Sequence, residues 1–248
     1  MASLVGSRVE RKEDKKLLTG RGKYTADVNF INQTYAYFVR SPHARAQIKK
    51  VDTSKALKAS GVISVLTGSD IANDKIGGLI AGWRIKSEDG SDMKVPAHPP
   101  LANETVNYVG DHVAVVIAES LDEARAAADL VKVDYKILKA VVNTNDAMSS
   151  EQIYKDIPKN MCFDWLLGDR AKVKEAFDKA DKIIKIDIVN NRLIPNAMEP
   201  RAANADYNPS TEEITLYTTS QNPHLARIII SAFNGVAPEN KLRVIAPD

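Results

Sequence analysis

The sequence contains one cysteine, Cys162, among its 248 residues. A lone thiol excludes a disulfide or a cysteine-rich metal site within the chain, and it fits a reducing compartment. No histidine or glycine motif surrounds Cys162, so we expect a partly buried structural thiol rather than a nucleophile.

Recognisable catalytic and metal-binding motifs are also absent. The chain has no HExxH, CxxC, GxSxG, GxGxxG or P-loop sequence, which removes the signatures of metalloproteases, simple hydrolases, kinases and Rossmann enzymes. None of the four histidines pairs with another at metal-ligand spacing: His43, His98, His112 and His224. For His43, in RSPHARAQI, we expect loop packing rather than ligand binding.

Long apolar runs and an excess of one charge are missing as well. The longest strongly apolar run, residues 113–118, is far shorter than the ~20 residues of a membrane span. The first residues, MASLVGSRVERKEDKK, lack the apolar core of a secretory signal. Lys plus Arg is 34 and Asp plus Glu is 32, a balance that argues against nucleic-acid binding. We therefore expect a cytoplasmic protein without a membrane span.

The first half of the chain has the pattern of a mixed domain. Residues 1–18 are polar and predict an arm, in which the charged residues 10–16 form a solvated face or a docking segment. Ser120 and Glu123 match a capping box at the start of an alanine-rich helix. Residues 71–100 predict an irregular loop. Period-two and apolar runs predict strands at residues 34–40, 46–51, 62–67, 113–118 and 131–135.

A weakly patterned stretch at residues 143–167 predicts a linker, after which a second unit begins. Asp169 is expected to cap a helix with one apolar face, and Asn222 to cap another that has Pro223 at its first position and Gly235 at its end. The apolar faces of these two helices contain Val173, Ala176, Phe177 and Ala180, and Ala226, Ile229, Ile230 and Phe233. Strands are predicted at residues 184–188, 202–207, 214–219 and 242–246.

Two polar clusters in this second unit are candidate sites. Gln221 stands where a predicted strand ends and a helix begins, a place whose free amides and positive dipole end suit an anion or an oxo ligand. The alternative is that Gln221 and Asn222 only cap the helix, and the pattern alone favours it. Glu199 and Arg201, in NAMEPRAA, are either substrate-side groups or, as we favour, a buried ion pair or cap.

Five segments, in order across residues 6–248, resemble one family: LLTGRGKYTADV, FVRSPHARAQIKKVDTSKA, GVISVLTGSDI, PLANETVNYVGDHVAVVIAESLDEARAAADLVKVDY and YTTSQNPH. The chain is similar to the molybdenum-cofactor large subunit of the xanthine oxidase and aldehyde oxidase family, and within it to form II-like carbon monoxide dehydrogenase large subunits. The resemblance implies an α+β fold. An arm at residues 1–18 precedes an α/β hammerhead domain at 19–142, a linker at 143–167 and the first part of a mixed α/β molybdopterin-binding domain at 168–248.

The resemblance also implies an oxidoreductase. In the family, a metal-bound hydroxide attacks an electrophilic carbon, a hydride passes to a sulfido ligand, and electrons leave through iron–sulfur and flavin subunits. The counterpart of Gln221 hydrogen-bonds the apical oxo group, so Gln221 is the expected cofactor-binding residue. No catalytic or metal-ligating side chain is expected in this chain, and Cys162 does not match the family's active-site cysteine loop.

The family's glycine-rich GGGFG loop, cysteine loop and glutamate base would follow Asp248. We therefore expect a truncated or split subunit that is inactive alone and joins its C-terminal part in a hetero-oligomer. Carbon monoxide, an aldehyde and an N-heterocycle remain open as substrates. The alternative function is a non-enzymatic hammerhead-type assembly or binding module, because the chain holds no complete catalytic constellation.

Overall fold

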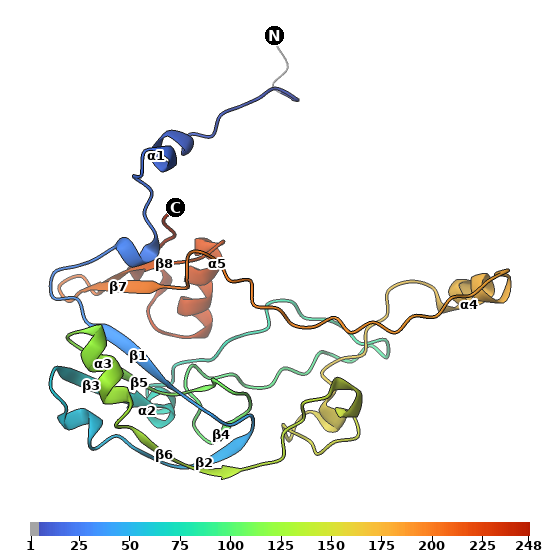
Figure 1. Cartoon of the computed structure of the whole chain (residues 1–248), viewed down its shortest axis with the longest axis horizontal. Coiled ribbons are helices and arrows are strands. Elements are labelled where there is room, and N and C mark those ends of the chain that lie inside the picture. The colour runs from blue at the N-terminus through green and yellow to red at the C-terminus, as the bar shows by residue number, and fades with distance from the viewer. Residues whose placement is uncertain (1–4) are drawn as a thin grey trace.

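Three small sheets of three strands each carry the fold of residues 5–248, the part of the chain that the computed structural model describes (Figure 1). In the first sheet, β5 (His112–Ala118) lies between β1 (Tyr35–Arg40) and β3 (Val62–Thr67), and both pairings are antiparallel. The helix α3 (Leu121–Ala128) packs on this sheet. Because β5 has a strand on each side and a helix on one face, its apolar run is buried.

The second sheet has β2 (Ala46–Asp52) between β4 (Thr105–Val106) and β6 (Lys132–Ile137), again antiparallel. Buried residues from both sheets form two apolar clusters that hold this half together. The first contains Ala56, Val65, Ala114, Val116, Ala127, Ala128 and Val131, and the second contains Ala46, Ala102, Val106 and Val113. The α+β character and all five strands expected in this half are confirmed.

The third sheet has β8 (Glu213–Thr218) between β7 (Ala203–Asn208) and β9 (Leu242–Ile245). The β7–β8 pairing is antiparallel and the β8–β9 pairing is parallel. Between β8 and β9 the chain crosses through α5 (Pro223–Ile228), a π-helical turn η5 (Ile229–Phe233) and the 3₁₀ turn η6 (Glu239–Lys241). Gly235 ends the helix with φ +70°, the left-handed conformation that glycine tolerates best.

The helical elements between the strands of the first half are short. After residue 53 the chain forms the 3₁₀ turn η2 (Ala56–Lys58), followed by Gly61 at φ +71°. The helix α2 (Gly68–Asn73) reaches into the region expected to be an irregular loop. Two further 3₁₀ turns, η3 (Thr144–Asp146) and η4 (Pro158–Asn160), lie within residues 143–167. In this stretch Ile157 is buried, and Asn160 Nδ2 donates hydrogen bonds to Ala147 O and Glu151 O. None of the described helices is long and apolar enough to cross a membrane.

Residues 163–198 form a long exposed arm, and two predictions made for it are wrong (Figure 1). The helix α4 (Arg170–Asp178) forms with Asp169 as its cap, but its expected apolar face is exposed. No strand forms at residues 184–188, because no other strand of residues 5–248 lies alongside to exchange backbone hydrogen bonds. The apolar face expected for α5 and η5 is not fully buried, because its last member, Phe233, is exposed.

A capping box at the start of α2 gives a pH-dependent prediction. The Thr67 hydroxyl and backbone N–H both donate to Asp70 Oδ2 at 2.7 Å, and they lower the pKa of Asp70 below 3.8. We expect Asp70→Ala to lower the free energy of unfolding by about 1 kcal/mol at pH 7. Because the folded-state pKa is lowered, this contribution is present above the unfolded pKa and disappears as the pH falls through the folded value.

Urea unfolding of both proteins at pH 7 and near the acid limit of folding measures this difference. Asp74→Ala, at the exposed end of the same helix, is the control and is expected to change stability by less than about 0.5 kcal/mol. An Asp70→Ala deficit that stays the same at both pH values contradicts the assignment.

Candidate functional site

A cavity of about 760 Å³ opens at the edge where the parallel strands β8 and β9 end. Ser220 and Gln221 follow β8, Pro247 and Asp248 follow β9, and Thr25 closes the cavity from the other half of the chain. The carboxyl ends of adjacent parallel strands are a common place for ligands, because loops and helix N-termini converge there. The remaining lining residues are Ile194, Pro195, Asn196, Ala197, Glu199, Pro200, Arg201, Thr218, Thr219 and Ala246.

The side chain of Gln221 is exposed on this cavity and has no hydrogen-bond partner within residues 5–248. Capping of α5 is done by its neighbour, since Asn222 Oδ1 accepts from Leu225 N at 3.0 Å. Ser220 Oγ in turn accepts from Asn222 N at 3.1 Å. The capping interpretation therefore holds for Asn222, while the Gln221 carboxamide stays free to bind a ligand.

Glu199 has a structural role at the wall of the cavity. Its Oε1 accepts from Thr25 N at 3.1 Å, which caps the 3₁₀ turn η1 (Thr25–Asp27). This confirms the cap interpretation of Glu199. The expected ion pair is absent from the described residues, because the Arg201 guanidinium is exposed and has no partner there. Arg201 thus leaves a free positive charge on the cavity wall.

Asp248 ties the charged N-terminal segment to the same cavity. Asp248 Oδ2 accepts from Lys23 N at 2.8 Å, and Lys16 Nζ forms an ion pair with Asp248 Oδ1. Lys16 lies in the short helix α1 (Asp14–Leu18). The Lys16 ammonium and the Lys23 amide lower the pKa of Asp248, so its carboxylate is ionised at neutral pH. The charged segment at residues 10–16 therefore has a docking contact through Lys16.

No group of three or more His, Cys, Asp or Glu side chains suited to a metal ion occurs among the described residues. Cys162 is half-buried, as expected, and lines none of the described cavities. His43 packs edge-on against Tyr135 with ring centroids 5.0 Å apart, as expected for a loop histidine.

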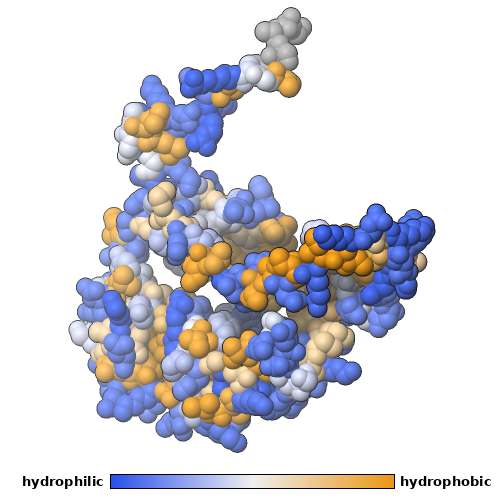
Figure 2. Space-filling view, turned by 45° about the vertical axis from the view of Figure 1, so that its right-hand side comes forward, coloured by the Kyte–Doolittle hydropathy of each residue, from blue (hydrophilic) through white to orange (hydrophobic). Residues whose placement is uncertain are grey.

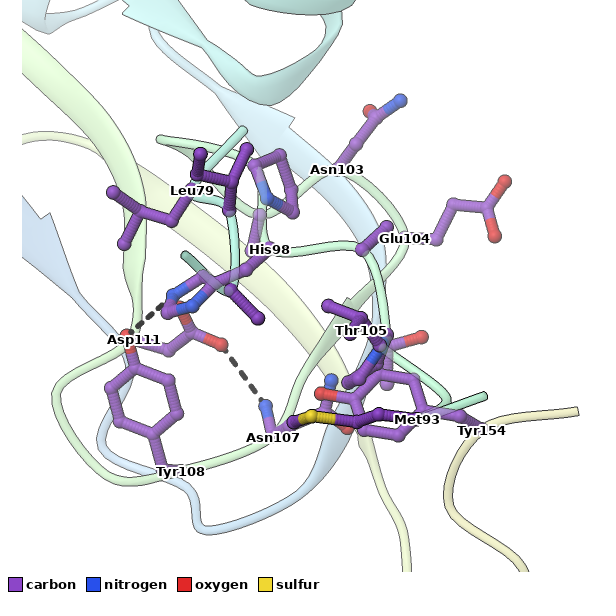
Figure 3. A pocket seen from close by; sticks show the side chains of 17 residues that line it. Leu79, Met93, His98, Asn103, Glu104, Thr105, Asn107, Tyr108, Asp111 and Tyr154 are labelled. Atoms are coloured by element: carbon purple, nitrogen blue, oxygen red, sulfur yellow. Dashed lines mark hydrogen bonds between the residues drawn. The ribbon is translucent and has the colours of Figure 1, made fainter. Parts of the chain in front are cut away.

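A second cavity, of about 610 Å³, lies in the half that contains the first two sheets (Figure 3). Tyr108 Oη lies 3.5 Å from His98 Nε2, and Asp111 accepts from Asn107 N at 3.1 Å. Burial and the nearby Asp111 carboxylate raise the pKa of Tyr108, so its phenol is neutral. Sequence reasoning missed this group because its members come from loops with no common spacing. Four of its polar residues are thus paired with one another, whereas the Gln221 carboxamide is unpaired, so we take the Gln221 cavity as the candidate site.

Comparison with known proteins gives two family matches that together span most of the chain. Residues 19–139 match the family "Aldehyde oxidase and xanthine dehydrogenase, a/b hammerhead domain". Residues 153–248 match "Molybdopterin cofactor-binding domain". The first match covers both sheets with β5 and β2 at their centres. The second match covers the exposed arm at residues 163–198, the third sheet and Gln221.

Individual relatives match over nearly the whole chain. The nicotine 6-hydroxylase large subunit of Paenarthrobacter nicotinovorans is 34% identical over 99% of this chain and 29% of its own length. The carbon monoxide dehydrogenase large chain of Afipia carboxidovorans is 33% identical over 98% of this chain and 30% of its own length. The structure of quinoline 2-oxidoreductase from Pseudomonas putida 86 superposes with a TM-score of 0.84 at 31% identity, over 98% of this chain and 30% of that chain.

The chain thus spans about 30% of the length of these relatives. The share differs in the nicotinate dehydrogenase large molybdopterin subunit of Eubacterium barkeri, which is 27% identical over 98% of this chain and 53% of its own length. The length outside the shared region therefore differs among these relatives.

The contact between Glu199 and Thr25 gives a direct test of how the cavity is closed. We expect Glu199→Ala to speed hydrogen exchange of the Thr25 amide roughly 10-fold, because a hydrogen bond to a charged acceptor is lost. Glu199→Gln keeps an acceptor at the same place and is expected to retain most of the protection. Exchange at Thr25 that is equal in all three proteins would show that Glu199 does not cap this turn.

Proposed function

We propose that this chain, which belongs to the xanthine oxidase family of molybdenum hydroxylase large subunits, helps to hold a molybdopterin-type molybdenum cofactor in an oxidoreductase. One observation carries the proposal. A glutamine with a free carboxamide stands between a strand end and a helix N-terminus, on the wall of a 760 Å³ cavity. This cavity lies in the part of the chain that matches the molybdopterin cofactor-binding family.

The residues around the cavity fit such a group. Because no cluster of ligating side chains occurs in residues 5–248, a metal here would need ligands from outside these residues, which an organic cofactor can supply. Gln221 and Arg201 offer unpaired donors, which suit oxo and anionic groups. The two carboxylates on the wall are already engaged, Glu199 by Thr25 and Asp248 by Lys16 and Lys23.

When bound, the cofactor would supply the oxidative hydroxylation of an electrophilic carbon. The protein's part is binding and orientation. The Gln221 side-chain NH₂ would donate a hydrogen bond to an oxygen acceptor, and the Arg201 guanidinium would balance negative charge. The β7–β8 pairing and the Asn222 cap hold the backbone on either side of these two residues.

The relatives support a proposal for the substrate and partners of the assembled protein. We propose a small substrate with an electrophilic carbon, the property that carbon monoxide, aldehydes and N-heterocycles share. The proposed partners are the remaining part of the large subunit and the iron–sulfur and flavin subunits, in a cytoplasmic hetero-oligomer. A non-enzymatic assembly module is the second candidate, favoured by the lack of a catalytic constellation within the described residues.

Two neighbouring substitutions separate ligand binding from capping. In the assembled protein, we expect Gln221→Ala to lower turnover and molybdenum content at least roughly 10-fold, because its donor would act at the cofactor. Its melting temperature should not change, since the side chain is exposed and unpaired within residues 5–248. Asn222→Ala, the control, should instead lower stability by about 1 kcal/mol through loss of the cap.

Metal analysis, turnover and thermal unfolding of both variants measure these effects. Full molybdenum content and turnover in Gln221→Ala, together with a large loss of melting temperature, would restore the capping interpretation. Assembled protein that never contains molybdenum would favour the assembly module.

A further inference from the structure

The cavity of about 610 Å³, whose lining comes from residues 79–111 and Tyr154, differs in charge from the Gln221 cavity. We call it the hammerhead cavity, and it shares no lining residue with the Gln221 cavity. The carboxylates of Glu104 and Asp111 line it, and its described lining contains no Lys or Arg. The wall is therefore locally negative, in a chain whose formal net charge is +2.

Asp111 is the buried member of this pair of carboxylates. Asp111 is 8% exposed, whereas Glu104 is exposed. Asp111 Oδ2 accepts a hydrogen bond from Asn107 N at 3.1 Å. Within residues 5–248 no Lys, Arg or His forms an ion pair with Asp111. Because a buried carboxylate is costly unless a cation faces it, a cationic ligand at this place would be stabilised.

The backbone around Asp111 is held on both sides. Asp111 O accepts from Ser41 N at 2.8 Å, and Gly110 N donates to Ser41 O at 2.8 Å. The strand β5 begins at the next residue, His112, whose carbonyl accepts from Ala102 N at 2.7 Å. The acid is thus attached to a fixed backbone at a strand end, which lowers the cost of ordering it when a ligand binds.

The other walls of the hammerhead cavity are apolar and aromatic. Met93, Val95 and Tyr154 are half-buried there. Figure 3 shows Tyr108 beside Asp111, with Met93 and Tyr154 across the cavity. Burial and the Asp111 carboxylate raise the pKa of both tyrosines, so the two phenols are neutral at pH 7. Neutral aromatic rings near one negative group suit a cation that has an apolar body.

This arrangement differs from the other exposed apolar surface. Figure 2 shows an apolar band along the arm, which includes Ile184, Ile186 and Ile188, and all three side chains are exposed. In the hammerhead cavity the apolar groups are half-buried and lie around a carboxylate. Shape and charge together therefore define a ligand class for the cavity, whereas the band offers apolar surface alone.

We propose that the hammerhead cavity binds a small organic cation, a protonated amine with an apolar body, whose N–H group donates a hydrogen bond to Asp111. The cation balances the buried charge, and its apolar body packs against Met93 and Tyr154. The volume of about 610 Å³ lies within the range of small-molecule pockets. The site requires no molybdenum cofactor, so the inference stands apart from the proposed function.

A bare metal ion fits the cavity less well. No group of three or more His, Cys, Asp or Glu side chains suited to a metal occurs among the described residues. Hard cations such as Mg²⁺ and Ca²⁺ need six or more oxygen ligands, and a wall that contains Met93, Val95 and Pro96 offers few. An organic cation needs only one charged acceptor and an apolar wall.

The test is an NMR titration of the full chain at pH 7 with three probes of similar size and different charge. The probes are benzylamine, which is protonated, benzyl alcohol, which is neutral, and benzoate, which is an anion. We expect benzylamine to shift the amide signals of residues 107–111 and to bind at least roughly 10-fold more tightly than benzyl alcohol, because a charge-assisted hydrogen bond is the stronger one. Benzoate should leave these signals unchanged.

Two substitutions that each remove one negative charge locate the interaction. Asp111→Asn keeps an acceptor for Asn107 N, and it is expected to lower the affinity for benzylamine at least roughly 10-fold without changing that for benzyl alcohol. Glu104→Gln, at the exposed carboxylate, is the control and is expected to change it by less than roughly 3-fold. If Asp111→Asn fails to fold, the three-probe comparison in the unaltered chain decides.

Equal affinity for benzylamine and benzyl alcohol would overturn the inference. So would a folded Asp111→Asn protein that keeps its affinity for benzylamine, or signal shifts confined to residues outside the cavity lining. Butylamine, which resembles a lysine side chain, tests the apolar body: binding as tight as that of benzylamine would favour a lysine of a protein partner and contradict the small-molecule site. None of these measurements involves molybdenum or Gln221, so their failure leaves the proposed function untouched.

Discussion

The cavity depends on the seating of residues 16–33 against the third sheet. These residues precede β1 of the hammerhead half, yet they contact side chains from the far end of the chain. Thr25 and Glu199, which form one of these contacts, are 174 residues apart. Lys16 and Lys23 likewise contact Asp248. The Asn204 side chain donates to Val28 O and to Gln33 Oε1 at 2.7 Å each, and the Phe30 ring packs against Tyr217. The candidate site is therefore built by both halves of the chain.

A second contact fixes the helix that begins next to Gln221. The Asn234 side chain donates to Gly77 O at 2.7 Å and to Gly78 O at 2.9 Å, and Gly77 N donates to Asn234 O. A Cβ atom on Gly77 would lie 2.1 Å from Phe233 O, so the close approach requires glycine. With Asn222 capping one end and Gly77 bound at the other, the helix holds the Gln221 junction in a fixed position. The loop at Gly77 and Gly78, in the hammerhead half, therefore contacts the end of the helix that begins next to the cavity.

Local chemistry made much of this fold predictable. The apolar run at residues 113–118 fixes a central strand, and the Asn222–Pro223 pair fixes the start of a helix. The Glu199 contact with Thr25 could be expected only as some cap, because a partner 174 residues away leaves no local signal. The strand at residues 184–188 was predicted wrongly for a related reason. Alternating hydrophobicity reports which faces can be buried, but it does not say whether the covering strands belong to the same chain.

Gln221 shows what pattern and structure each contribute. Its position suggested either a cap or a ligand, and only the geometry separates them, since Asn222 makes the cap and Gln221 has no partner in residues 5–248. The proposed role of Gln221 toward a cofactor rests on its place in the region that matches the molybdopterin cofactor-binding family and on its unpaired carboxamide at the cavity.

The most direct test is metal analysis by mass spectrometry of this chain isolated with its partners from its native host. We predict about one molybdenum per chain in that complex and almost none in the chain expressed alone, because the proposed function has the cofactor held by groups from this chain and from its partners together. A complex that contains its iron and flavin but no molybdenum would contradict it, and so would a full complement of molybdenum on the isolated chain.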